Sequence, residues 1–122
     1  MENQHRSISG YRDLTAEEID LINRIKSKGA ELLELQSELA KNIRDRTTFL
    51  IEVVTSHQAV LDGPATLSAE QRAEHTECRD DAQEELNVIY AAEPARWASI
   101  AKTDIQTGVM ALVRAAGKST SI

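Results

Sequence analysis

The sequence has few aromatic residues: they make up 3% of it, as one Phe, one Trp and two Tyr. Large aromatic side chains supply much of the apolar area of a thick globular core, so a core of that kind is excluded. Ala, Leu, Ile, Glu and Arg dominate instead, which is typical of paired helices. Because such a thin layer buries little surface, the composition predicts one all-α domain over residues 1–122 that self-associates.

Cysteine and long apolar runs are also scarce. Cys78 is the one cysteine, which excludes an internal disulfide. Residues 1–6 lack the apolar run of a signal peptide, and no stretch approaches the roughly 18 apolar residues of a membrane span. We therefore expect a protein of the reducing cytoplasm with no membrane partner.

Basic residues are nearly missing from the middle of the chain. Residues 50–95 hold ten acidic and two basic side chains, whereas residues 96–122 hold four basic and one acidic. The net charge of −6 argues against binding duplex nucleic acid, which usually needs a basic face. If the two less acidic ends of the chain meet, a small anion can bind there without opposing the net charge.

A capping box predicts the start of the first helix. Thr15 can cap with its hydroxyl and Glu18 can reach back to the Thr15 amide, while Leu14 and Ile19 are placed for a hydrophobic staple. The helix should continue through the β-branched stretch 47–55 to about Leu61. Its predicted packing seam has nearly heptad spacing: Ile22, Ile25, Gly29, Leu32, Gln36, Leu39 and Ile43.

Turn residues at 62–67 end this helix, and Ser68 with Gln71 forms a second capping box. The second helix should run to about Ala92, and Pro94 either starts a new helix or kinks a continuous one that ends near Gly117. The arms of this long antiparallel helical hairpin have similar lengths, so residue x should lie beside residue 130 − x. That register places Lys26 near Asp104, and Tyr11 near Arg114 and Lys118. Residues 1–14 form a polar lead-in, and residues from about 45 to 93 form an acidic extension of the hairpin.

Three side chains near the first helix suit an anionic ligand. The staple should hold Tyr11 at the start of the helix, where its ring can stack on a base, with Arg12 and Lys26 near enough to bind phosphate.

Gly29 costs up to about 1 kcal/mol relative to Ala in a helix; it marks close approach of a backbone or ligand, or is simply tolerated. Arg114 can donate two hydrogen bonds to a phosphate or compensate the helix dipole in the last turn. Trp97 is predicted to anchor the packing of the last helix.

Two blocks of the sequence, residues 8–15 with 18–29 and residues 96–97 with 103–115, resemble the phage-encoded anti-CBASS sponge family, second type. The first anti-Thoeris sponge, which traps a cyclic ADP-ribose isomer, is a relative of that family. The resemblance implies a compact homo-oligomer, a hexamer, that sequesters cyclic di- and trinucleotides in the cytoplasm of the infected bacterial host.

The resemblance also implies roles for residues, with nucleotide pockets between subunits. Tyr11 would stack on a base and Lys26 would contact phosphate. A second pocket, for cyclic trinucleotides, would lie near Lys28, Thr107, Met110 and Arg114.

No catalytic constellation or phosphate loop is visible in the sequence, so we expect a binding protein rather than an enzyme, without a cofactor. His75 and Cys78 are three residues apart, but two candidate ligands do not predict a zinc site. Two alternatives stay open: a sponge for a cyclic ADP-ribose isomer, and a helical scaffold without a small ligand.

Overall fold

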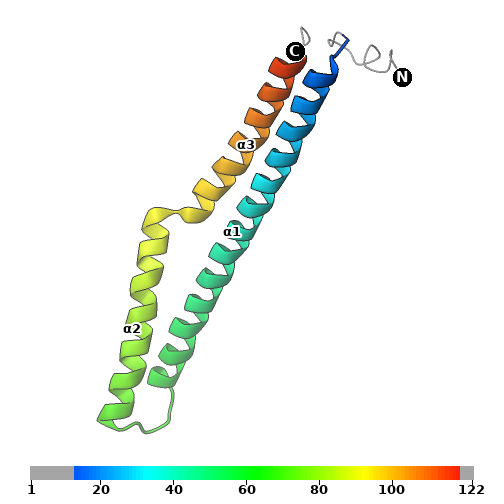
Figure 1. Cartoon of the computed structure of the whole chain (residues 1–122). Helices are drawn as coiled ribbons and strands as arrows, with labels where there is room; N and C mark the ends of the chain where they lie inside the picture. The colour runs from blue at the N-terminus through cyan, green and yellow to red at the C-terminus, as the bar shows by residue number, and fades with distance from the viewer. Residues whose placement is uncertain (1–12, 119–122) are drawn as a thin grey trace. The chain divides into compact units, whose positions relative to one another are not determined.

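The computed structural model describes residues 13–118. Helix α1 spans Ala16–Asp62, α2 spans Ala69–Ala92 and α3 spans Pro94–Gly117 (Figure 1). The predicted all-α hairpin is confirmed, and the β-branched stretch 47–55 lies inside α1 as expected. The described part divides into two compact units, which we call the terminal unit (residues 13–37 and 99–118) and the turn unit (residues 38–98).

In the terminal unit the first half of α1 packs antiparallel to α3 (Figure 1). Ile22 is 8% exposed, Gly29 is buried, and Ile105, Val109 and Val113 are half-buried. These small and medium side chains form a thin contact layer. The terminal unit therefore has no thick core within the described residues, as the shortage of aromatic residues predicts.

In the turn unit the second half of α1 packs against α2 around Leu50, Ala82 and Leu86, which are 3%, 6% and 3% exposed. The capping box at Ser68 is confirmed: Gln71 N donates to Ser68 Oγ at 3.0 Å and Ser68 N donates to Gln71 Oε1 at 2.9 Å. Reciprocal bonds of this kind satisfy two backbone amides at the start of α2.

The helical path is interrupted before Pro94, as expected if Pro94 starts a new helix. Glu93 adopts the left-handed conformation with φ 51° and ψ 51°, and its amide donates to Ile89 O, which ends α2. Pro94 then starts α3, where its missing amide hydrogen costs no helical bond. A new helix therefore begins at Pro94, rather than a kinked continuation of α2.

The predicted packing seam is partly wrong. Leu32 and Leu39 are 50% and 55% exposed, and the inward positions are taken by Leu33 and Ala40, which are half-buried. A straight helix turns by 3.6 residues, so it drifts by about 20° per heptad against a strict seven-residue repeat. That drift carries the inward position one residue forward along α1.

Candidate functional site

The start of α1 and the end of α3 meet in the terminal unit. Thr15 N donates to Glu18 Oε1 at 2.9 Å and Glu18 N donates to Thr15 Oγ1 at 3.1 Å, which confirms the first capping box. The other carboxylate oxygen of Glu18 accepts from Lys118 Nζ at 3.2 Å, and the Glu18 side chain is only 12% exposed. One carboxylate therefore caps α1 and also holds the last described residue beside it.

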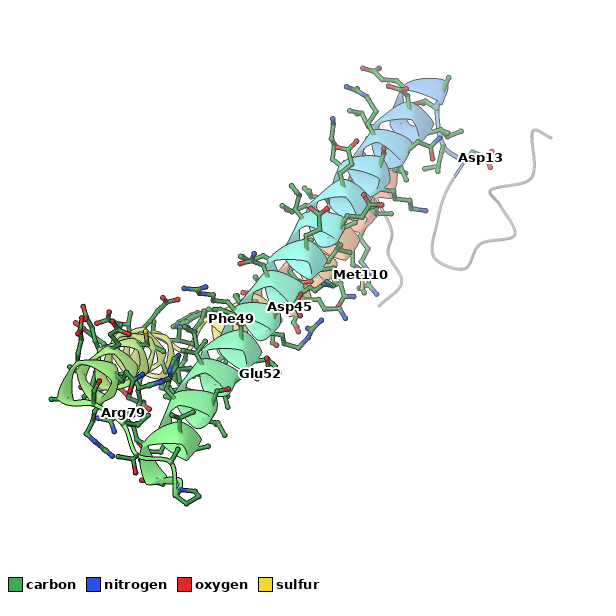
Figure 2. The ribbon with its side chains drawn as sticks, turned by 90° about the horizontal axis from the view of Figure 1, so that it is seen from below. Asp13, Asp45, Phe49, Glu52, Arg79 and Met110 are labelled. Atoms are coloured by element: carbon green, nitrogen blue, oxygen red, sulfur yellow. The ribbon has the colours of Figure 1, made fainter. Side chains whose placement is uncertain are left out.

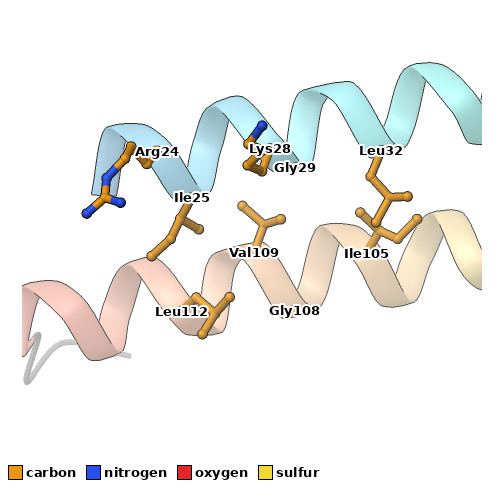
Figure 3. Close-up of a pocket in the computed structure, with 9 residues that line it drawn as sticks. All are labelled: Arg24, Ile25, Lys28, Gly29, Leu32, Ile105, Gly108, Val109 and Leu112. Atoms are coloured by element: carbon orange, nitrogen blue, oxygen red, sulfur yellow. The ribbon is translucent and has the colours of Figure 1, made fainter. Parts of the chain in front are cut away.

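Gly29 marks a close approach of α1 to α3. A methyl group added at Gly29 would lie 2.6 Å from Val109 Cγ2, closer than two carbon atoms can approach. Figure 3 shows Val109 pointing at Gly29, between Ile25 and Leu32. Of the explanations considered from sequence, close approach holds, but the neighbour is the Val109 side chain rather than a backbone or a ligand.

A small hollow of about 250 Å³ lies on one side of this contact. Lys26 and Gln106 line it, together with Gly29, Ala30, Leu33 and Val109. The hollow therefore combines one cation and one amide with an apolar floor. The predicted neighbour of Lys26 was Asp104, but Gln106 and Val109 lie there instead.

The register of the terminal unit differs from the predicted sum of 130. The contact pair Gly29 and Val109 sums to 138, and the bonded pair Glu18 and Lys118 sums to 136. The estimate treated the second arm as one unbroken helix. The non-helical residue Glu93 breaks that arm, so residue number does not map onto length along the helix axis uniformly.

A larger groove of about 430 Å³ lies on the other side of the contact (Figure 3). Its lining is mostly apolar: Ile25, Leu32, Ile105, Val109 and Leu112, with Gly29 and Gly108. Arg24 and Lys28 stand at its edge. Each of these cations pairs with a carboxylate on its own helix: Arg24 Nε lies 2.9 Å from Asp20 Oδ2, and Lys28 Nζ lies 3.4 Å from Glu31 Oε2.

The predicted ligand residues Met110 and Arg114 follow Gln106 at intervals of four along α3, so the three form a stripe of helical neighbours. Of this stripe, Gln106 lines the small hollow together with Lys26. Met110 is 58% exposed. Arg114 lies in the last turn of α3, where a cation also compensates the helix dipole.

Lys28 does not join this stripe within one chain, because it lines the larger groove on the opposite side. Thr107 is exposed and lies about 200° around α3 from Val109 at about 100° per residue, so it faces away from α1. It precedes Arg114 by seven residues and therefore lies on nearly the same side of α3. The residues that line the groove with Lys28 do not include Thr107, Met110 or Arg114.

Tyr11 and Arg12 lie outside the described residues. Asp13 is the first described residue, close in sequence to the capping box that Lys118 contacts. The roles predicted for Tyr11 and Arg12 thus stay predictions.

Sequence reasoning missed Gln106, which lines the small hollow, although its position one turn before Met110 was a usable signal. The packing role predicted for Trp97 is wrong: Trp97 is 59% exposed, and the adjacent Ala98 is buried at 7%. Adjacent helical positions point about 100° apart, so only one of the two can face inward. The Arg96 guanidinium lies over the Trp97 ring, 5.5 Å from its centroid.

Leucines collect on the larger-groove side of the terminal unit. Leu21, Leu32, Leu35 and Leu112 are 39%, 50%, 60% and 55% exposed, and we call these four residues the leucine face. Leu32 and Leu112 also line the groove. Grouped exposed leucines usually mark a contact with another molecule.

Three groups of the turn unit have shifted pKa values. Arg46 donates two hydrogen bonds to Glu85, of 2.6 and 2.7 Å, which lower the pKa of Glu85 and raise that of Arg46. A hydrogen bond from Lys41 lowers the pKa of Asp45. Phe49, one turn after Asp45, is 52% exposed with the Arg46 guanidinium 5.4 Å from its ring centroid (Figure 2).

Within residues 13–118, no three His, Cys, Asp or Glu side chains converge as metal ligands would. Each helix in that range falls short of the length or the apolar character that crossing a bilayer requires.

Comparison with known proteins decides the family. The model of the Acb2/Tad1 hairpin domain matches residues 4–117. The chain belongs to this family. It is also 52% identical, over 115 residues that cover 94% of each chain, to Anti-CBASS protein 2 of Pseudomonas phage JBD67. The matched range of the Acb2/Tad1 model includes the acidic middle segment and every candidate ligand residue.

Proposed function

We propose that this chain is a phage anti-defence protein that sequesters cyclic di- and trinucleotides and thereby blocks CBASS immunity. It holds the signal in the cytoplasm of the infected bacterium without changing it chemically. Membership of the Acb2/Tad1 hairpin family, with a relative named Anti-CBASS protein 2, is the observation that carries this proposal.

The terminal unit has the chemistry that such a ligand needs. Lys26 provides a positive charge over an apolar floor beside Gln106, and Arg114 extends the cationic side along α3. Phosphates would contact the two cations, and the exposed side chain of Met110 would cover the flat face of a base. Tyr11 would stack on a base, which is worth about 1–3 kcal/mol.

One small hollow of about 250 Å³ is shallow for a ligand with two or three nucleotides, because small-molecule sites usually bury most of the ligand surface. A second copy of the chain would complete the enclosure. The leucine face supplies an apolar surface for that contact, and we infer a homo-oligomer with pockets between subunits. In such pockets Lys28 of one copy can approach Thr107, Met110 and Arg114 of another.

Isothermal titration calorimetry against a panel of cyclic di- and trinucleotides tests the proposal. We expect tight binding with heat release, and recovery of intact ligand after heat denaturation. Lys26→Met should weaken binding about 10- to 100-fold, because it removes a charged hydrogen bond worth about 1.5–3 kcal/mol. Lys41→Met is the matched control, because Lys41 pairs with Asp45 in the turn unit.

Three outcomes would contradict the proposal. Heat with a cyclic ADP-ribose isomer, and none with the cyclic di- and trinucleotides, would favour the alternative of a cyclic ADP-ribose sponge. If the folded oligomer releases no heat with the cyclic nucleotides or with the cyclic ADP-ribose isomer, the result would favour a scaffold protein. Recovery of a cleaved ligand would make the protein an enzyme.

A further inference from the structure

Two histidines meet across the turn unit. His57 Nδ1 of α1 lies 2.8 Å from His75 Nδ1 of α2, and the ring centroids are 5.0 Å apart. Both side chains are half-buried. They lie near the turn 63–68, where a cross-helix contact helps to hold the ends of α1 and α2 together.

The contact depends on protonation. A hydrogen bond between two Nδ1 atoms needs one ring to donate and the other to accept. A neutral pair can do this, and so can a pair that shares one extra proton. When both rings are protonated both Nδ1 atoms carry hydrogen, so the bond is lost and two positive charges face each other.

The surroundings do not compensate a second charge. The residues one turn from His57 on α1 are all apolar: Val53, Val54, Val60 and Leu61. Those one turn from His75 on α2 are Gln71, Arg72, Cys78 and Arg79. Both arginines bond across the helix pair, Arg72 to Leu61 O at 3.5 Å and Arg79 to Gln58 Oε1 at 2.9 Å. The histidines are therefore flanked by two fixed cations.

Nearby carboxylates are engaged or turned away. Asp62 accepts from Gln58 at 2.9 Å, and Asp80 accepts from Arg79 at 3.0 and 2.9 Å. Glu74 is exposed and points about 100° away from His75 around α2. The turn 63–68 carries no titratable side chain.

We propose that the His57–His75 pair is a pH-sensitive latch for the turn end of the helix pair. Near neutral pH it joins α1 to α2; under acid conditions the doubly protonated rings separate and this end opens. Double protonation costs the folded unit the Nδ1–Nδ1 contact, whereas the unfolded chain has no such contact to lose. Stability should therefore be lower under mildly acid conditions than near neutral pH. Ordinary carboxyl groups titrate at about pH 4, below this mildly acid range, so the two effects separate.

Thermal unfolding at pH 7.5 and pH 5.2 tests the latch in the full-length protein. We expect the melting temperature to fall by about 4 °C or more in the acid buffer. The double variant His57→Gln with His75→Gln should lose most of this pH dependence. His5→Gln, which leaves the pair intact, is the matched control and should behave like the unmodified protein.

Amide hydrogen exchange at the same two pH values, corrected for intrinsic exchange rates, keeps the test decisive if the double variant is globally weakened. In the unmodified protein, acid should reduce protection around residues 57–62 and 69–75 much more than around residues 22–33. Equal loss of protection in both units, or an equal melting shift in the double variant, would overturn the proposal. So would a melting temperature that does not change with pH.

Discussion

The residue that limits the approach of α1 to α3 is Gly29. Its position leaves no room for a Cβ, since Val109 Cγ2 would lie 2.6 Å away, and the χ1 angle of a valine in a helix is strongly restricted. Gly108, by contrast, is exposed and has nothing within 4 Å of an added Cβ. The same substitution to alanine should therefore change the stability of the protein in opposite directions at the two glycines.

Gly29→Ala should destabilise the protein by about 1 kcal/mol, because an overpacking cost of about 1–3 kcal/mol exceeds the helix-propensity gain of about 1 kcal/mol. Gly108→Ala should stabilise it by up to about 1 kcal/mol. Urea unfolding at one fixed protein concentration measures both. The reverse order of the two variants would contradict the observed packing.

A second prediction at the residue scale concerns acid stability. The two bonds from Arg46 lower the pKa of Glu85 below its usual 4.5, so the bonded carboxylate contributes stability that is present above that pH and is lost as the pH falls below it. Glu85→Gln should flatten the stability curve in this acid range. Glu84→Gln, on the exposed neighbour, is the control. The measurement is the urea midpoint of unfolding between about pH 3 and 5.5, the range in which carboxyl groups ordinarily titrate. If the midpoint changes with pH equally steeply in both variants, the stabilising role of the Glu85 carboxylate is refuted.

At the scale of helices, the local chemistry of the sequence predicted most of the structure. Both capping boxes and the turn at 62–67 rest on hydrogen bonds between residues three apart or on turn residues, and such local signals do not depend on tertiary contacts. The inward face of α1 was predicted less well. Leu32 and Leu33 are adjacent residues of the same type, so the sequence alone does not show which of the two faces the other helix. The register at Gly29 could not be predicted, since it depends on how Glu93 interrupts the second arm.

The interruption itself yields a prediction. Glu93 has φ 51°, a left-handed conformation that costs a residue with a Cβ roughly 1–2 kcal/mol. Its ion pair with Arg96, at 3.6 Å and largely exposed, contributes little. Glu93→Gly should therefore be more stable than Glu93→Ala by about 1 kcal/mol, because both variants lack the carboxylate and only glycine relieves the strain.

Denaturant midpoints of these two variants at one protein concentration provide the comparison. Glycine also gives the unfolded chain more conformational freedom, which destabilises the glycine variant by about 0.4–1 kcal/mol. The predicted difference of about 1 kcal/mol between the two variants already includes this effect. If Glu93→Ala is as stable as Glu93→Gly or more so, strain at this position is not what shapes the interruption.

At the scale of the whole molecule, the candidate site divides into parts that sequence can and cannot predict. Lys26 and Arg114 were proposed from their charge together with a family resemblance, and Met110 from the resemblance alone. Lys26 lines the small hollow, and Met110 and Arg114 follow along α3 from Gln106. Lys28 lies on the other side, as its spacing of two residues from Lys26, about 200° around a helix, indicates. Whether Lys28 joins the others depends on a second copy, and one sequence does not specify how copies are arranged.

The leucine face gives the corresponding test of assembly. Leu35 is 60% exposed, so Leu35→Glu should leave the fold of one chain intact while it places a charge in the proposed contact, where an unpaired buried charge is strongly unfavourable. We expect its mass by light scattering to drop below that of the unmodified oligomer. Val88→Glu, at an exposed valine of the turn unit (64%), is the matched control and should keep the full mass. Because the pockets are proposed to lie between copies, Leu35→Glu should also lose cyclic nucleotide binding. Retained tight binding by a monomeric variant would show that one chain holds the ligand alone.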